Sequence, residues 1–137
     1  MDFKGKKILI LAGASVHNKV VKAAKEMGLY VIVTDYLEPH LSPAKQLADE
    51  SWMYSITDVD AIVEKCRQEN VDYVLSNGLS RIGRNTFNVL ETIKFLIDNN
   101  INLYLQKEKF TLLQDNGRPS PFAAIMLATL STCAELE

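Results

Sequence analysis

Short, continuous apolar runs alternate along this chain with segments whose apolar residues recur every three or four positions. A continuous apolar run bounded by glycine or polar residues is typical of a strand that is covered on both faces of a parallel sheet. On this basis the sequence predicts five strands, at residues 6–13, 29–36, 51–56, 71–76 and 101–106.

The segments between these runs have the spacing of amphipathic helices. Gly28 ends the first helix, and Ser42 with Pro43 supplies an N-cap and a first helical residue for a short second helix. Thr57 and Asp60 form a pair similar to a capping box before the third helix. The apolar positions expected to face the core are Val20, Val21, Ala24 and Met27 in the first helix, Val59, Ile62, Val63 and Cys66 in the third, and Val89, Leu90, Ile93, Leu96 and Ile97 in a fourth at residues 86–99.

Strands that alternate with helices define the fold class. We expect a three-layer α/β/α domain with a doubly wound, mainly parallel five-stranded sheet and right-handed crossovers, of the flavodoxin-like or Rossmann-like kind. Residues 110–120 predict a short extended piece and a turn at Asn116–Gly117. Residues 1–137 have the length of one domain.

The last predicted helix, at about residues 121–135, is apolar on nearly every side. A helix of this kind cannot leave all its apolar side chains in water, because a large exposed apolar patch normally marks an interface. We therefore expect self-association, at least in part, as a homodimer. The residues expected to form this interface are Phe122, Ile125, Met126 and Leu130.

Composition and charge limit the classes of partner. The formal net charge is -2, from 15 Lys and Arg against 17 Asp and Glu, which gives no general attraction to nucleic acid. Cys66 and Cys133 lie far apart in apolar helical contexts, which favours buried free thiols in a reducing compartment over a disulfide or a metal pair. We expect no signal peptide, and the sequence has no apolar run long enough to cross a bilayer, so we expect a cytoplasmic protein without a membrane partner.

The candidate chemistry follows two of the predicted strands. In doubly wound sheets, binding groups gather beyond the carboxyl ends of the strands, at the switch in strand order. "AGASVHN" (12–18) follows the first strand and contains Ser15, whereas "NGLSRIGRN" (77–85) follows the fourth and contains Ser80, Arg81 and Arg84. Two fixed positive charges near a helix N-terminus indicate an anion site, and phosphate is the anion that fits best.

Other polar residues give weaker signals. Gly13 lacks the Gly-x-Gly-x-x-Gly spacing of a dinucleotide site and more simply serves a tight turn. His17 and His40 have no companions at metal-ligand spacing. Asp35, at the end of the second strand, could meet a ribose hydroxyl, but the glycine fingerprint is missing. We expect neither a cofactor nor a metal ion.

From about residue 71 to 137 the chain resembles the catalytic domain of serine recombinases, the resolvase/invertase family. The resemblance rests on "DYVLSNGLSRIGRN" (72–85), "VLETIKFLIDNNINLYLQ" (89–106) and "DNGRPSPFAAIMLATLSTCAELE" (115–137). It implies that Arg81 and Arg84 are the phosphate-binding arginines of that family, with Ser80 at a position where many members have Asp. It also implies a dimer through the last helix, and DNA phosphate as a partner.

From about residue 1 to 72 the chain instead resembles the preATP-grasp N-terminal domain of ligases related to the carbamoyl-phosphate synthase large subunit. This resemblance rests on "KKILILAGASVHNKVVKAAKEMGLYVIVTDYLEPHLSPAKQLADES" (6–51) and "TDVDAIVEKCRQENVD" (57–72). Ser15 falls at the position of the recombinase nucleophile, but Leu11 and Gly13 stand where recombinases have tyrosine and arginine. The ATP-binding residues of the ligases lie in later domains, which this sequence does not include.

Three functions are compatible with these features. The first is a chimeric, engineered or natural α/β domain, with a preATP-grasp-like half at 1–72 and a recombinase-like half at 73–137. It would carry part of a phosphate site and have no intact catalytic activity. The second is a serine recombinase catalytic domain that cleaves DNA phosphodiesters with Ser15 as the nucleophile. The third is a nucleotide or small-molecule binding module derived from the ligase-type half.

Overall fold

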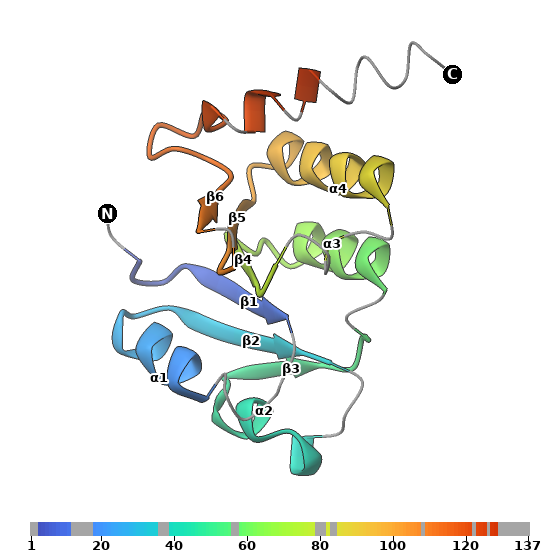
Figure 1. The fold of residues 1–137 in the computed structure, drawn as a ribbon. Helices are drawn as coiled ribbons and strands as arrows, with labels where there is room; N and C mark the ends of the chain where they lie inside the picture. Colours follow the sequence, from blue (N-terminus) through green and yellow to red (C-terminus); the bar gives the residue numbers. More distant parts are fainter. Residues whose placement is uncertain are drawn as a thin grey trace.

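The protein contains one six-stranded sheet with the strand order β3-β2-β1-β4-β5-β6 (Figure 1). The computed structural model describes residues 3–11, 18–35, 39–55, 58–78, 82, 85–107, 109–121, 123–125 and 127–128. Neighbouring strands are parallel except β5 and β6, which are antiparallel. The strands are β1 (Lys7–Leu11), β2 (Tyr30–Thr34), β3 (Glu50–Trp52), β4 (Tyr73–Ser76), β5 (Asn102–Leu105) and β6 (Phe110–Thr111).

The helices lie in two layers, one on each face of the sheet (Figure 1). One layer packs α1 (Asn18–Glu26) beside α2 (Pro43–Leu47), which follows a short 3-10 turn, η2 (Pro39–Leu41). The other layer packs α3 (Val59–Gln68) beside α4 (Thr86–Asp98). The three-layer, mainly parallel α/β fold is thus confirmed, and the order of the first five strands is that of a Rossmann sheet. The sheet has six strands instead of five, because the short extended piece at 110–111 pairs with β5 and forms the edge strand β6.

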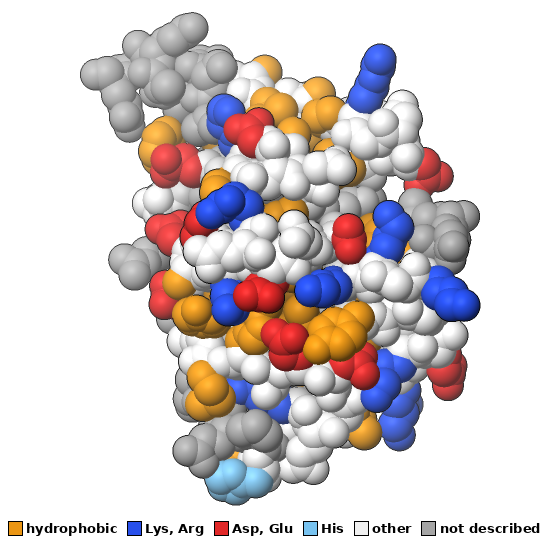
Figure 2. Space-filling model, turned by 180° about the vertical axis from the view of Figure 1, so that it is seen from behind, with side chains coloured by type: hydrophobic (Ala, Val, Ile, Leu, Met, Phe, Trp, Pro, Cys, Tyr) orange, Lys and Arg blue, Asp and Glu red, His pale blue; other side chains and the backbone are white. Residues whose placement is uncertain are grey.

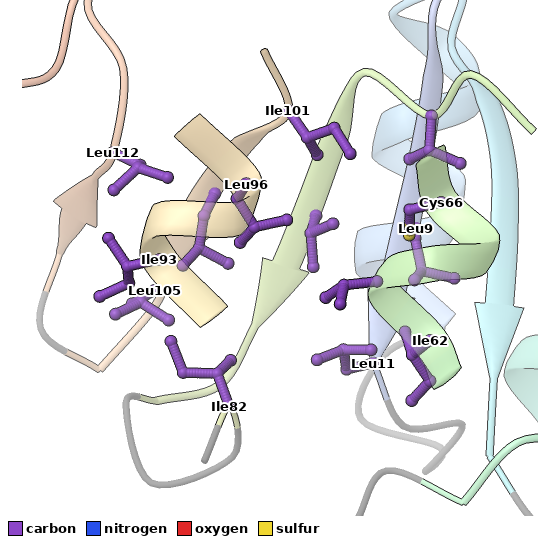
Figure 3. Close-up of a cluster of buried hydrophobic side chains, with 14 of the residues drawn as sticks. Leu9, Leu11, Ile62, Cys66, Ile82, Ile93, Leu96, Ile101, Leu105 and Leu112 are labelled. Carbon is purple, nitrogen blue, oxygen red and sulfur yellow. The ribbon is translucent and has the colours of Figure 1, made fainter. Parts of the chain in front are cut away.

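Two apolar clusters hold the layers together. Alternate residues of a strand point to opposite faces, so Leu9 and Leu11 of β1 face α3 and α4, whereas Ile10 faces α1 and α2. The larger cluster, shown in Figure 3, joins residues from early and late parts of the chain. Its fully buried members include Leu9, Ile32, Ile93, Leu96, Leu103 and Leu112.

Three helices end in the same way before the next strand begins. Gly28, Asn70 and Asn100 follow α1, α3 and α4, with φ angles of 90°, 58° and 55°. In each case the next backbone N–H donates to the carbonyl five residues earlier, as in a Schellman ending. That next residue is a buried apolar one: Leu29, Val71 or Ile101. This repeated turn determines the direction in which the chain leaves each helix and enters the following strand.

Some local expectations differ from the structure. Ser42 occupies the N-cap position of α2, but its side chain makes no capping bond and donates instead to Asp35 Oδ2 at 3.1 Å. The N-cap of α3 is Asp58; Thr57, the expected cap, lies outside the described residues. Met27 was expected in the core and is 50% exposed, because it follows the last residue of α1.

The C-terminal segment begins as predicted, with helical residues at 121, 123–125 and 127–128. Ala123 is fully buried in the larger apolar cluster, whereas Ile125 is 63% exposed. Phe122, Met126 and Leu130 lie outside the part whose side chains are described. In the described ranges, none of the helices has the length and apolar content needed to cross a membrane.

Candidate functional site

The order of the strands reverses between β1 and β4, which is where doubly wound sheets place their binding sites. These two strands pair in parallel, with Leu9 opposite Val74 and Ile10 opposite Leu75. Adjacent strands lie about 4.8 Å apart. The chain therefore leaves β1 after Leu11 and β4 after Ser76 at the same edge of the sheet, which we call the β1–β4 edge.

All four sequence-predicted site residues, Ser15, Ser80, Arg81 and Arg84, lie outside the described residues. They belong to the two segments that leave the β1–β4 edge, residues 12–17 and 77–85. The structure describes several neighbours of these residues: Asn18, Asn77, Gly78, Ile82 and Asn85.

The exit from β4 is held by hydrogen bonds. Ser76 is 1% exposed, and its Oγ donates to the carbonyl oxygen of Gly78 at 3.2 Å. The carbonyl oxygens of Ser76 and Asn77 accept from the backbone N–H groups of Gln106 and Lys107, at 3.0 and 2.7 Å. These bonds fix the first residues of the 77–85 segment against the end of β5.

The end of the same segment is also anchored. Ile82 is 2% exposed and belongs to the larger apolar cluster. Asn85 is the N-cap of α4, and its side-chain oxygen accepts from the backbone N–H of Asn88 at 2.9 Å. This cap was not predicted from the sequence, although an asparagine directly before a helical apolar stripe is a recognised N-cap signal.

The first residue of α1 is unusual. Among the described residues, the Oδ1 atom of Asn18 is the one buried side-chain oxygen or nitrogen without a hydrogen-bond partner. Buried polar groups in native proteins are nearly always bonded, and exceptions point to a water, an ion or a ligand. Asn18 directly follows the 12–17 segment, so this atom belongs to the helix that begins beyond the end of β1.

A buried ion pair lies at the end of the neighbouring strand β2. The Nζ of Lys45, whose side chain is fully buried, lies 3.0 Å from Asp35 Oδ1 and donates to the Asp35 carbonyl oxygen at 3.0 Å. Asp35 Oδ2 accepts from Ser42. Both carboxylate oxygens of Asp35 are thus bonded within the protein, and the pair ties α2 to the end of β2. No spacing in the sequence signalled that Lys45 is buried.

The charged side chains of the described residues do not themselves define an anion site. On the face shown in Figure 2, Lys and Arg side chains lie interspersed with Asp and Glu side chains. A groove of about 340 Å³ between α3 and α4 is lined by Asp60, Glu64 and Glu91, which disfavour an anion there.

In the described ranges no group of three His, Cys, Asp or Glu side chains is arranged to hold a metal ion. Burial raises the pKa of the Cys66 thiol to about 12, so this cysteine is not a nucleophile near neutral pH.

The fold defines a doubly wound α/β domain whose strand order reverses between the paired strands β1 and β4. The family model for the resolvase N-terminal domain matches residues 17–137. The chain therefore belongs to the resolvase N-terminal domain family, and it is a serine recombinase-like domain. A resolvase family site-specific recombinase from Streptococcus pneumoniae has the same fold, with a TM-score of 0.53 at 18% identity over 96% of this chain and 87% of that chain.

The chain is also similar to ATP-grasp-type enzymes. It is 34% identical over 103 residues to the formate-dependent phosphoribosylglycinamide formyltransferase of Prochlorococcus marinus, a match that covers 74% of this chain and 24% of that protein. The N5-carboxyaminoimidazole ribonucleotide synthetase of Thermotoga maritima has a TM-score of 0.54 at 26% identity, over 75% of this chain and 26% of that chain. The chain thus spans about a quarter of the length of these relatives.

Both resemblances found in the sequence are therefore confirmed. The family model reaches back to residue 17, well before residue 71, and the match to the formyltransferase is longer than the first 72 residues. The two matches overlap along the chain, so the division into halves at residue 72 stays a prediction.

Proposed function

We propose that this chain is a chimeric serine recombinase-like domain that binds phosphate at the β1–β4 edge and has no intact DNA strand-transfer activity. Its first half, residues 1–72, derives from an ATP-grasp-type domain, and its second half, residues 73–137, derives from a resolvase. The observation that carries the proposal is the parallel pairing of β1 with β4. Because of this pairing, the segment that contains Ser15 and the segment that contains Arg81 and Arg84 both begin at the β1–β4 edge.

The binding part of the proposal rests on charge and on the anchoring of the 77–85 segment. Arg81 and Arg84 supply two permanent positive charges, and guanidinium groups bind phosphate oxygens in a bidentate manner. The amide of Asn18 supports a ligand at the same edge, because its unbonded position suits a polar partner. A side-chain amide can turn, so it can present its N–H₂ group to a phosphate oxygen.

The loss of chemistry is supported by the residues around Ser15. Leu11 occupies the place of the recombinase tyrosine; it is 5% exposed, lies in the larger apolar cluster and has no polar group to offer. Gly13 replaces an arginine, so one of the charges that would stabilise a pentacovalent phosphate is missing. A serine hydroxyl without these partners is a weak nucleophile.

The binding claim is tested with inorganic phosphate. Isothermal titration and thermal unfolding would compare the wild type, an Arg81→Ala/Arg84→Ala variant and an Arg118→Ala control. Arg118 is a suitable control because it lies far from the β1–β4 edge. It follows Gly117, which lies close to Asn100, and Asn100 precedes β5 at the opposite edge of the sheet. Phosphate at a hundred times its Kd should stabilise the wild type and the control by about 2.7 kcal/mol, and the double variant not at all. Equal stabilisation of all three proteins would overturn the proposal.

A working recombinase is the second candidate, and the family match favours it. Resolvases commonly bind DNA, so the test is incubation with duplex DNA followed by denaturing electrophoresis. The proposal expects no covalent protein–DNA adduct. An adduct that forms with the wild type and is lost in Ser15→Ala would establish the recombinase activity instead.

A nucleotide-binding module is the third candidate, and the similarity to ATP-grasp-type enzymes favours it. Titration with ADP separates it from phosphate binding. Tighter binding of ADP than of inorganic phosphate, unaffected by the Arg81→Ala/Arg84→Ala change, would support this candidate and contradict ours.

We also propose that the chain forms a homodimer through its C-terminal helix. The support is the position of Ile125, which is 63% exposed on a segment whose neighbour Ala123 is fully buried. Ile125→Asp should shift the protein to a monomer in sedimentation experiments. Leu41→Asp changes a similarly exposed apolar residue in η2, at 58%, and should leave the dimer intact. A wild type that is monomeric at high concentration would contradict this proposal.

A further inference from the structure

Met53 is an exposed methionine whose place beside the end of β2 is fixed by its neighbours in the chain. Trp52 pairs with Thr34 in the sheet, and the Oγ1 of Thr34 donates to the carbonyl oxygen of Tyr54 at 3.1 Å. Trp52 belongs to the larger apolar cluster, on the side of α3 and α4, and Tyr54 packs against the same cluster. Because alternate residues of an extended chain point to opposite faces, Met53 lies on the face covered by α2.

The thioether of Met53 contacts a buried charge on that face. The Nζ of Lys45 donates to Met53 Sδ at 3.3 Å, and the same ammonium lies 3.0 Å from Asp35 Oδ1. The side chain of Lys45 is fully buried, whereas Met53 is 53% exposed. A small solute can therefore reach Met53 from water, although its sulfur is bonded to a group in the interior.

Oxidation changes what this sulfur side chain can accept. A thioether is a weak hydrogen-bond acceptor, whereas a sulfoxide is polar. A hydroperoxide converts one into the other: a sulfur lone pair forms the S–O bond and the O–O bond breaks. The sulfur loses two electrons to the peroxide. With hydrogen peroxide, the proton of the transferred oxygen passes to the leaving hydroxide, which departs as water.

The geometry allows the new oxygen to meet the ammonium. Methionine has three rotatable bonds, and an exposed side chain is free to turn its sulfoxide oxygen toward the Nζ of Lys45. A hydrogen bond from a charged donor is about twice as strong as one between neutral groups. The bond to the sulfoxide oxygen should therefore be stronger than the bond to the thioether sulfur that it replaces.

We propose that Met53 is an oxidation site whose sulfoxide is bound by the buried ammonium of Lys45. The new bond joins the residue after β3 to α2, and the ion pair of Lys45 with Asp35 already joins α2 to the end of β2. Oxidation of Met53 therefore stabilises the protein, in contrast to sulfoxides that disrupt apolar contacts. This site is separate from the proposed phosphate site, and neither depends on the other.

Met27 provides a matched comparison. It is 50% exposed and follows the last residue of α1, and in the described part of the chain its sulfur accepts no hydrogen bond. A sulfoxide at this position stays in water, so its formation should hardly change the stability of the protein.

The test uses two proteins that differ in which of these methionines they keep. Met27→Leu/Met126→Leu keeps Met53, whereas Met53→Leu/Met126→Leu keeps Met27, and both keep Met1. Each is treated with hydrogen peroxide and then with a thiol, which reduces oxidised cysteines and leaves sulfoxides intact. Peptide mass spectrometry measures conversion at each methionine, and thermal unfolding follows. Oxidation should raise the melting temperature of the protein that keeps Met53 by about 4 °C, and change that of the other by less than about 1 °C.

A third protein tests the role of the ammonium. Asp35→Asn/Lys45→Leu, added to the protein that keeps Met53, removes the charge together with its partner, and oxidation should then give no rise. A rise that persists in this protein means that Lys45 does not bind the sulfoxide. An unchanged or lower melting temperature after oxidation of Met53, or an equal rise after oxidation of Met27, overturns the inference. So does a Met53 that stays reduced while Met27 is converted.

Discussion

A conservative substitution in the second half of the chain should lower the melting temperature that is observed through a tryptophan in the first half. Ile93 on α4 is fully buried, and it belongs to the same apolar cluster as Trp52 on β3, which is 5% exposed and is the one tryptophan of the sequence. Ile93→Val removes one methylene group from this cluster. Such a change costs about 1 kcal/mol, which corresponds to a fall of about 4 °C in the melting temperature of a domain of this size.

The assay records thermal unfolding twice, by Trp52 fluorescence and by far-UV circular dichroism. Ile93→Val should lower both midpoints equally, because unfolding is cooperative when both halves share one core. Ile32→Val, at a fully buried position of β2, should do the same from the first half. Ile125→Val removes the same methylene group from a position that is 63% exposed, and should change the midpoint of a dilute, monomeric sample by less than about 1 °C. A variant Ile93→Val that shifts the dichroism transition and leaves the Trp52 transition unchanged would contradict a core shared by both halves.

Four further outcomes are expected. Lys45→Met should destabilise the protein by about 3–5 kcal/mol in urea unfolding, because Asp35 stays buried without its partner, and adding Asp35→Asn should recover part of the loss. Asn100→Gly should raise the unfolding free energy by about 1 kcal/mol, since a non-glycine residue in the left-handed region carries strain of that order and glycine does not; an unfolding free energy below that of the wild type would contradict the turn geometry. In a Cys133→Ser background, Cys66 should not react with a thiol reagent at pH 8 until urea unfolds the protein. Because folding raises the pKa of the Cys66 thiol to about 12, its stabilising contribution should be present below about pH 8.5 and decline as the pH rises toward 12. This decline in the unfolding free energy should be smaller in Cys66→Ala, and an equal decline in both proteins would contradict the expectation.

Much of the fold could be predicted from the periodicity of the sequence. Continuous runs such as Ile8–Leu11 are apolar because helices cover both faces of the sheet, and the stripe of Val89, Ile93 and Leu96 on α4 points to the core, as it must. Local pattern could not show that Asn70 and Asn100 replace glycine in two of the three helix endings, since asparagine tolerates a left-handed backbone without requiring it. The sixth strand is two residues long and exists only through its pairing with β5.

The candidate site was predictable in part, because chain order alone places residues 12–18 and 77–85 after strands. The sequence did not predict that β1 and β4 are neighbours, because the strand order depends on contacts between distant parts of the chain. The anchors at Ile82 and Asn85 were not identified: the first is one isoleucine within a polar loop, and its burial depends on distant residues of the larger apolar cluster. The buried side chain of Lys45 was also missed, because a lysine in a short amphipathic helix normally reaches solvent.

The pairing of β1 with β4 is the feature on which the shared core and the proposed phosphate site both depend. Nuclear Overhauser effects between backbone protons of the two strands measure it directly in isotope-labelled protein. We expect interstrand effects that link Leu9 with Val74 and Ile10 with Leu75, in addition to those that link β1 with β2. A spectrum in which β1 shows effects only to β2, and β4 only to β5, would contradict the account.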